Sequence, residues 1–230
     1  MTVSNAIARP ELFWISGSPP SWRVMLALAI KEIGYASRLL DASSSAHKAA
    51  AYLALNPRGQ VPTLRDGDVV VRESVATLAY LDARWPERPI FGADPAAAAE
   101  IWQKVMDFES NLRPAITTVA QAIFCNQISE RVPELSSATE MASAELDLLQ
   151  EGLRGRSFLA GDRPTAADCV LYPGIAWLAR AFDKSSADGA LPTATRALLD
   201  NRPVFDAWRD RIEALPGFSS TYPPHWRNRN

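Results

Sequence analysis

Residues Asn56–Ser74 decide the fold, and they read Asn-Pro-Arg-Gly-Gln-Val-Pro-Thr-Leu-Arg-Asp-Gly-Asp-Val-Val-Val-Arg-Glu-Ser. Pro62 has no N–H for a sheet ladder, so we expect it at the start of a strand or on an edge, where the amide of Val61 can face a ligand. The bond between these two residues is a candidate cis peptide. Asp66-Gly67 separates two short apolar runs, which is typical of a β-hairpin.

Glu73 and Ser74 come directly after the hairpin and open an apolar stretch that ends at Trp85. If this stretch is a helix, a carboxylate, a hydroxyl and the free amides of a helix N-terminus meet at one place. A zwitterionic amino acid fits such a place, with its ammonium on Glu73 and its carboxylate on Ser74 and the amides. The segment therefore predicts a ligand site as well as a fold.

Composition limits the class of protein. The chain has 230 residues, of which 47% are hydrophobic, enough to build one large domain or two small ones with a sizeable core. Its 24 basic and 26 acidic residues give a net charge of -2 without long runs of either sign, so we expect neither nucleic acid nor membrane as a partner. With no apolar core of signal-peptide length at the N-terminus, a cytoplasmic enzyme or binding protein is expected.

The two cysteines predict neither a disulfide framework nor a metal site. Cys125 and Cys169 lie far apart and lack the spacing of metal ligands. We expect each of them to be a small buried apolar residue. No metal cofactor is expected.

The chain divides near residue 90. Before this point, short apolar runs alternate with helical patterns in the order βαβ, α, ββα, with a helix expected over residues 21–33 and another over 46–55. Three prolines and a glycine follow within residues 86–95, which is typical of a linker. We therefore predict a domain at 1–87, a linker at 88–97 and a second domain at 98–230.

The second domain is expected to be all helical. One long amphipathic pattern runs from Trp102 to Ile123, with a kink or break at Pro114. Further helices are expected over residues 144–153, 165–182 and 204–215. Thr165 and Asp168 fit a capping box, so we assign them to structure and not to chemistry.

The order of elements in the first domain is thioredoxin-like, which directs attention to the start of its first helix. Redox proteins of that fold keep Cys-Pro-x-Cys there, whereas this chain has Ser18-Pro19-Pro20-Ser21. Hydroxyls in place of both sulfurs exclude disulfide exchange. A hydroxyl beside a helix N-terminus can instead stabilise a thiolate that belongs to a ligand.

With these motifs the chain resembles the glutathione S-transferases over nearly its whole length. Residues 56–62 with Glu73 and Ser74 are similar to the family's γ-glutamyl recognition segment. The resemblance implies that Pro62 is cis and that the Val61 backbone pairs with the cysteinyl part of glutathione. His47 and Lys48 resemble phi- and theta-type members of the family, and this resemblance implies that they hold the glycyl carboxylate.

Ser18 lies where serine-type members of the family keep their thiol-activating residue. Because a serine is too weak a base, it is expected to donate its proton to the sulfur, and Ser16 is the competing hydroxyl. Ser18 also has a plain interpretation as the cap of its helix, with proline at the favoured first position. The two roles are compatible.

The resemblance implies that glutathione is a substrate, that its thiolate attacks an electrophilic and largely apolar co-substrate, and that the protein is a homodimeric detoxification enzyme. The co-substrate is expected over Ser18, between the domains, against residues 113–117 and Trp177.

Two alternative functions stay open. The segment Ser21-Trp22-Arg23-Val24 resembles the zeta class, whose members isomerise maleylacetoacetate, although that class has Ser-Ser-Cys where this chain has Ser18-Pro19-Pro20. A non-catalytic module of the same fold is the other.

Overall fold

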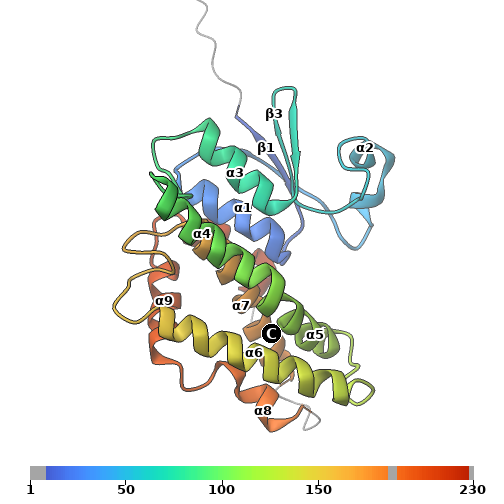
Figure 1. Cartoon of the computed structure of the whole chain (residues 1–230). Helices are drawn as coiled ribbons and strands as arrows, with labels where there is room; N and C mark the ends of the chain where they lie inside the picture. The colour runs from blue at the N-terminus through green and yellow to red at the C-terminus, as the bar shows by residue number, and fades with distance from the viewer. Residues whose placement is uncertain (1–8, 186–190, 228–230) are drawn as a thin grey trace, which may run out of the picture. The chain divides into compact units, whose positions relative to one another are not determined.

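The computed structural model describes residues 9–185 and 191–227, and these residues form two compact units (Figure 1). One unit contains the described residues up to Pro89 together with those from Pro216 onward. The other contains the described residues of Ile90–Leu215. The chain therefore returns to its first unit after completing the second.

The first unit is built on a four-stranded mixed sheet with the strand order β2-β1-β3-β4. The strands are β1 (Glu11–Trp14), β2 (Ala36–Leu39), β3 (Thr63–Asp66) and β4 (Val69–Arg72). Strand β1 pairs in parallel with β2 and antiparallel with β3, and β3 forms a hairpin with β4. This arrangement confirms the predicted thioredoxin-like unit, and the hairpin loop is Gly67-Asp68, with Gly67 at a φ of +58°.

Two helices of the first unit, α1 (Pro19–Ile30) and α3 (Ser74–Arg84), pack against each other. Figure 1 shows them on one side of the strands, with the short helix α2 (Ala50–Leu53) on the other. Fully buried leucines of the strands and of α3 form the core between sheet and helices: Leu12, Leu64, Leu78 and Leu81.

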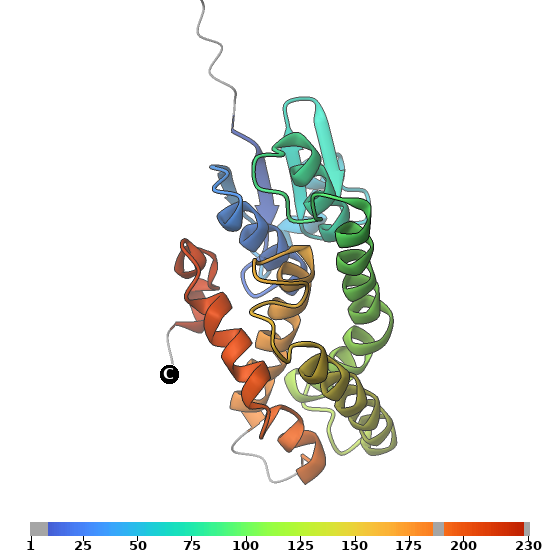
Figure 2. The same cartoon turned by 60° about the vertical axis from the view of Figure 1, so that its left-hand side comes forward.

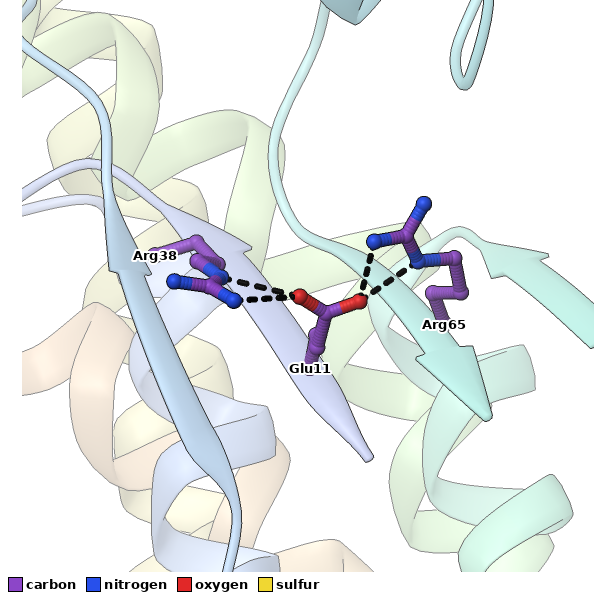
Figure 3. Close-up of polar contacts among 3 residues, drawn as sticks. All are labelled: Glu11, Arg38 and Arg65. Atoms are coloured by element: carbon purple, nitrogen blue, oxygen red, sulfur yellow. Dashed lines mark hydrogen bonds and ion pairs between the residues drawn. The ribbon is translucent and has the colours of Figure 1, made fainter. Parts of the chain in front are cut away.

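The other face of the sheet carries a cluster of three charged side chains (Figure 3). Glu11 on β1 lies between Arg38 on β2 and Arg65 on β3. Arg38 Nε donates to one carboxylate oxygen over 2.9 Å, and Arg65 Nε donates to the other over 2.6 Å. The hydrogen bonds from Arg38 and Arg65 lower the pKa of Glu11.

The second unit is helical, as predicted. Its long helices are α4 (Pro95–Asp107), α5 (Arg113–Phe124), α6 (Val132–Gly152), α7 (Ala166–Ser185) and α9 (Pro203–Glu213), and a short α8 spans Thr193–Arg196. Helix α7 contacts α4, α5 and α9, and Figure 2 shows it in the middle of the unit. A π-helical segment, Phe108–Leu112, joins α4 to α5. Pro114 follows it in the first turn of α5, where a missing N–H costs little.

Two helix predictions were wrong in extent. The helix expected over residues 46–55 is instead a 3-10 turn (Ala46–Lys48) followed by α2, because the backbone of Ala49 between them is extended. The helix expected over residues 144–153 is only the end of α6. The first half of α6 was not predicted, because two consecutive serines interrupt its apolar pattern. Leu135, Ala138 and Ala142 nevertheless repeat on its buried face.

Asp168 anchors the beginning of α7 and is completely buried. Its carboxylate accepts from the Thr165 amide over 2.8 Å, as the predicted capping box requires. The Thr165 hydroxyl donates to the same carboxylate, and the indole of Trp208 and the amide of Leu159 complete its environment. Burial raises the pKa of Asp168, and these hydrogen bonds oppose the rise.

The two cysteines lie in different environments. Cys169 is buried in α7, as expected for a small apolar residue. Cys125 is exposed at the end of α5, so the prediction of a buried residue was wrong there. Within the described ranges, no helix is long and apolar enough to span a membrane.

Candidate active site

Ser18 is the N-cap of α1, with an extended backbone and a half-buried side chain. Its Oγ accepts from the amide of Ser21 over 3.4 Å. Pro19 and Pro20 occupy the first helical positions and have no N–H, so Ser21 is the first residue able to donate. The cap uses only a lone pair of the hydroxyl, and the hydroxyl proton therefore stays available for a ligand.

Ser16, the competing hydroxyl, pairs with a residue from the far end of the chain. Its Oγ lies 2.7 Å from Nδ1 of His225. His225 could not be predicted from the sequence, because 209 positions separate it from Ser16 and no motif surrounds it. The structure therefore distinguishes the two serines, one as a helix cap and the other as the partner of an imidazole.

The loop before β3 has the predicted form. The Val61-Pro62 peptide is cis, and Pro62 directly precedes the strand. Two buried side chains hold the loop through the Gln60 carbonyl. The Tyr52 hydroxyl donates to this oxygen over 2.5 Å, and the Asn56 side-chain amide donates to it over 2.8 Å. Tyr52 is a second residue that sequence analysis missed.

Glu73 and Ser74 lie at the N-terminus of α3, as predicted. Glu73 is exposed and has a positive φ of 69°, whereas the Ser74 side chain is buried. Nη1 of Arg23 donates to the Ser74 Oγ over 3.2 Å. A guanidinium, a hydroxyl and helix-start amides favour an anion here, while the Glu73 carboxylate favours a cation beside it.

His47 and Lys48 lie against the loop that contains Pro62. Lys48 Nζ donates to the Gly59 carbonyl over 2.9 Å and to the Arg58 carbonyl over 3.3 Å. Gly59 has a φ of +56°, and a Cβ there would lie 2.9 Å from the His47 carbonyl oxygen, so this close approach requires glycine. His47 Nδ1 is buried and has no hydrogen-bond partner among the described residues.

The predicted site residues thus form two linked groups in the first unit. One group joins His47 and Lys48 to the loop that ends at Pro62. Helix α1 links the other group, because Ser18 caps it and Arg23, five residues later, reaches Ser74. Trp177, expected beside the co-substrate, belongs to the second unit and stacks on Phe124 with ring centres 5.6 Å apart. Its role stays a prediction.

No group of three or more His, Cys, Asp or Glu side chains in residues 9–185 and 191–227 is arranged to hold a metal ion.

Comparison with known proteins identifies the family. The protein-family model of the glutathione S-transferase N-terminal domain matches residues 17–84, and that of the C-terminal domain matches residues 112–216. Glutathione S-transferase A of Pleuronectes platessa is 30% identical over 228 residues, covering 94% of this chain and 92% of the relative. A zeta-class glutathione S-transferase of Euphorbia esula is 32% identical over 167 residues, covering 72% and 74% of the two chains.

A solved structure extends the comparison to the fold. The glutathione S-transferase of the Antarctic clam Laternula elliptica superimposes with a TM-score of 0.77 at 31% identity, covering 97% of this chain and 96% of that one. The chain belongs to the glutathione S-transferase family, and it is an enzyme of that class.

Proposed function

We propose that this enzyme binds glutathione in its first unit and conjugates the glutathione thiolate to an electrophilic, largely apolar co-substrate. One observation carries the proposal: a single helix, α1, presents the Ser18 hydroxyl at its start and holds Ser74 through Arg23. A site for an amino acid and a site for a thiolate are thereby fixed to the same rigid element.

The proposed binding mode assigns each part of glutathione to residues of matching charge or hydrogen-bonding capacity. Glu73 takes the ammonium of the γ-glutamyl group, and Ser74 with the first amides of α3 takes its carboxylate. The Val61 backbone pairs with the cysteinyl part next to Pro62. His47 and Lys48 hold the glycyl carboxylate, for which Lys48 has a third proton beyond the two carbonyl bonds described above.

The proposed chemistry depends on the acidity of the bound thiol. A free thiol has a pKa of ~8.5 and is only a few per cent ionised at neutral pH. Lowering that pKa by about two units takes ~2.7 kcal/mol of preferential thiolate stabilisation. The Ser18 hydroxyl and the N-terminus of α1 supply this stabilisation, and the thiol proton leaves to solvent.

The thiolate then attacks an electrophilic carbon of the co-substrate. With an aryl halide, the sulfur–carbon bond forms, the carbon–halogen bond breaks and halide leaves with its electron pair. The products are the thioether conjugate and a halide ion, so glutathione is consumed once in each turnover. This consumption defines the proposed activity.

A glutathione-dependent isomerase of the maleylacetoacetate type is the second candidate. Similarity to the zeta-class relative from Euphorbia esula favours it. Pro19 and Pro20 argue against it, because zeta-class members have a serine and a cysteine there. An isomerase regenerates glutathione, so measuring glutathione consumption with each substrate separates the two activities.

The proposed domain roles, assembly and location of the enzyme rest on its sequence and on its family. From the sequence, residues 1–87 are assigned to glutathione binding, 88–97 to a linker and 98–230 to a co-substrate domain, whereas in the structure the residues from Pro216 onward belong to the first unit. Homodimer formation, a cytoplasmic location and a role in detoxification stay predictions.

The wild-type enzyme gives the first test. Calorimetry measures glutathione affinity, thiolate absorbance against pH gives the pKa of the bound thiol, and an aryl halide measures conjugation. Binding with a lowered thiol pKa and net conjugation supports the proposal. Binding without a lowered thiol pKa contradicts it and indicates a non-catalytic binding module.

A further inference from the structure

The segment Pro216–Trp226 belongs to the first unit and packs along α1. Trp22, a buried residue of α1, is the centre of this contact. Its indole donates to the Thr221 hydroxyl over 2.9 Å, and its ring meets those of Tyr222 and Trp226 edge-on. These contacts attach the end of the chain to the helix that Ser18 caps.

His225 of this segment is seated on the turn that leads into α1. The turn spans Ile15–Ser18 and is closed by a hydrogen bond from the Ser18 amide to the Ile15 carbonyl over 3.2 Å. His225 contacts both central residues of the turn. Its Nδ1 bonds to Ser16, and its ring lies so close to Gly17 that a Cβ there would be 2.8 Å from Cε1.

Gly17 provides a second constraint on the same contact. Its φ of +80° favours glycine, and the imidazole fills the space that a side chain would need. The turn therefore has room for the imidazole only because residue 17 is glycine. Because Ser18 is the last residue of the turn, the position of its hydroxyl depends on how firmly the turn is held.

We propose that His225 is a positioning residue for thiol activation: through Ser16 and Gly17 it holds the turn that aims the Ser18 hydroxyl at the glutathione sulfur. The proposal rests on the proposed function. A hydrogen bond to a thiolate must be placed within about 0.5 Å to be fully effective, and the 3.4 Å cap bond holds the Ser18 hydroxyl only weakly. The C-terminal segment thus completes the thiol site.

A purely structural role for His225 is disfavoured by its surroundings. The imidazole is exposed and meets the Trp226 ring with ring centres 6.1 Å apart, whereas Trp22 is buried and contacts the buried rings of Phe218 and Trp226 directly. Removing the imidazole should leave the segment attached and the fold intact. The effect is then expected in the chemistry of the bound thiol.

The test compares His225→Ala, His225→Asn and Ser16→Ala with wild type. In His225→Ala, the thiolate fraction of bound glutathione and the conjugation rate should fall about 3- to 10-fold, as expected for the loss of one hydrogen bond. Glutathione affinity and the melting temperature should stay unchanged. His225→Asn should recover much of the loss, because the amide can bond Ser16 from nearly the position of Nδ1.

A double-mutant cycle tests the route through Ser16. Ser16→Ala should reproduce the effect of His225→Ala, and the double variant should be no worse than either single variant. Ser220→Ala, an exposed change in the same segment, is the matched control and should behave as wild type.

Three results would overturn the proposal. In the first, the pKa of the bound thiol is the same in His225→Ala as in wild type, although Ser18→Ala raises it. This result leaves the proposed function intact. The second is a parallel loss of glutathione affinity and melting temperature in His225→Ala, which indicates a structural role. The third is a wild type that never lowers the thiol pKa, which removes the proposed function as well.

Discussion

Arg23 donates from Nη1 to the hydroxyl oxygen of Ser74 over 3.2 Å, so the first helix fixes the start of the third. Both residues are buried. Because the Ser74 oxygen accepts this bond, its own proton can point toward a ligand. The guanidinium also adds positive charge beside the free amides of α3. A residue outside the predicted motif thereby prepares the motif for a carboxylate.

Glu73 and Ser74 should therefore dominate glutathione affinity. Ser74→Ala and Glu73→Ala each remove a charge-assisted hydrogen bond, worth about 1.5 to 3 kcal/mol, or roughly a 10- to 100-fold loss of affinity. Calorimetry with glutathione measures the loss. Glu87→Ala, which changes an exposed carboxylate of the same unit, is the control. Unchanged affinity in both variants would remove this site from the proposal.

The sheet cluster of Glu11, Arg38 and Arg65 should give acid-sensitive stability (Figure 3). The two arginines lower the pKa of Glu11 in the folded state, so its stabilisation is present above the unfolded-state pKa and is lost as pH falls through the folded-state pKa. Glu11→Gln should be less stable than wild type near neutral pH, and the difference should shrink toward pH ~3.

Denaturant unfolding at several pH values measures this difference in the free energy of unfolding. Glu87→Gln, which changes an exposed carboxylate, should show no comparable pH dependence. A difference between Glu11→Gln and wild type that stays constant with pH would show that the ion pairs do not act through titration of Glu11.

Asp168 should be essential for stability and dispensable for binding. In Asp168→Asn, an amide group replaces one of the two carboxylate oxygens. A donor then meets either the amide and hydroxyl of Thr165 or the amide of Leu159 and the indole of Trp208. We expect a loss of about 1 to 3 kcal/mol in the free energy of unfolding. Glutathione affinity of the folded protein should not change. Asp162→Asn, at an exposed position nearby, is the control, and equal stability of the two variants would contradict the prediction.

The homodimer predicted from the family would involve α4. This helix exposes two large apolar side chains, with Trp102 at 38% and Met106 at 52% exposure. Covering them would stabilise a dimer through the hydrophobic effect. Sedimentation should show a dimer at micromolar concentration, and Met106→Glu should shift it toward monomer. Leu148→Glu changes an exposed residue of α6 and should not. A monomeric wild type would contradict the prediction.

The first unit could be predicted well because its signals are local. Pro62, the hairpin turn and the carboxylate-hydroxyl pair lie within one segment, and each limits the backbone in a known way. Helix boundaries were less predictable. The helix expected over residues 46–55 is interrupted at Ala49. There the contacts of Lys48 and Tyr52 with the loop before β3, and not intrinsic helix propensity, decide the backbone conformation.

The partners of the site residues could not be predicted, because they depend on contacts between distant segments. Arg23 stands in the sequence as part of the segment that resembles the zeta class, and only the packing of α1 on α3 brings it to Ser74. His225 lies near the end of the chain, after the whole second unit. No periodicity or motif connects it with Ser16.

Ser18→Ala tests the chemistry apart from binding. If Ser18 donates to the sulfur, this variant should keep glutathione affinity within a few-fold and raise the pKa of the bound thiol. Conjugation of an aryl halide should fall about 100- to 1,000-fold if this hydroxyl is the main electrostatic donor. The field at the N-terminus of α1 would remain and would limit the loss.

Ser16→Ala distinguishes the two serines. The Ser16 hydroxyl bonds His225, so it affects the thiol only indirectly, through the position of the turn. Its effect should therefore be about 3- to 10-fold, the worth of one neutral hydrogen bond, and well below that of Ser18→Ala. The bound thiol pKa, measured by thiolate absorbance in both variants, ranks them directly. A larger shift in Ser16→Ala than in Ser18→Ala would transfer thiol activation to Ser16 and make His225 the neighbour of the activating hydroxyl itself.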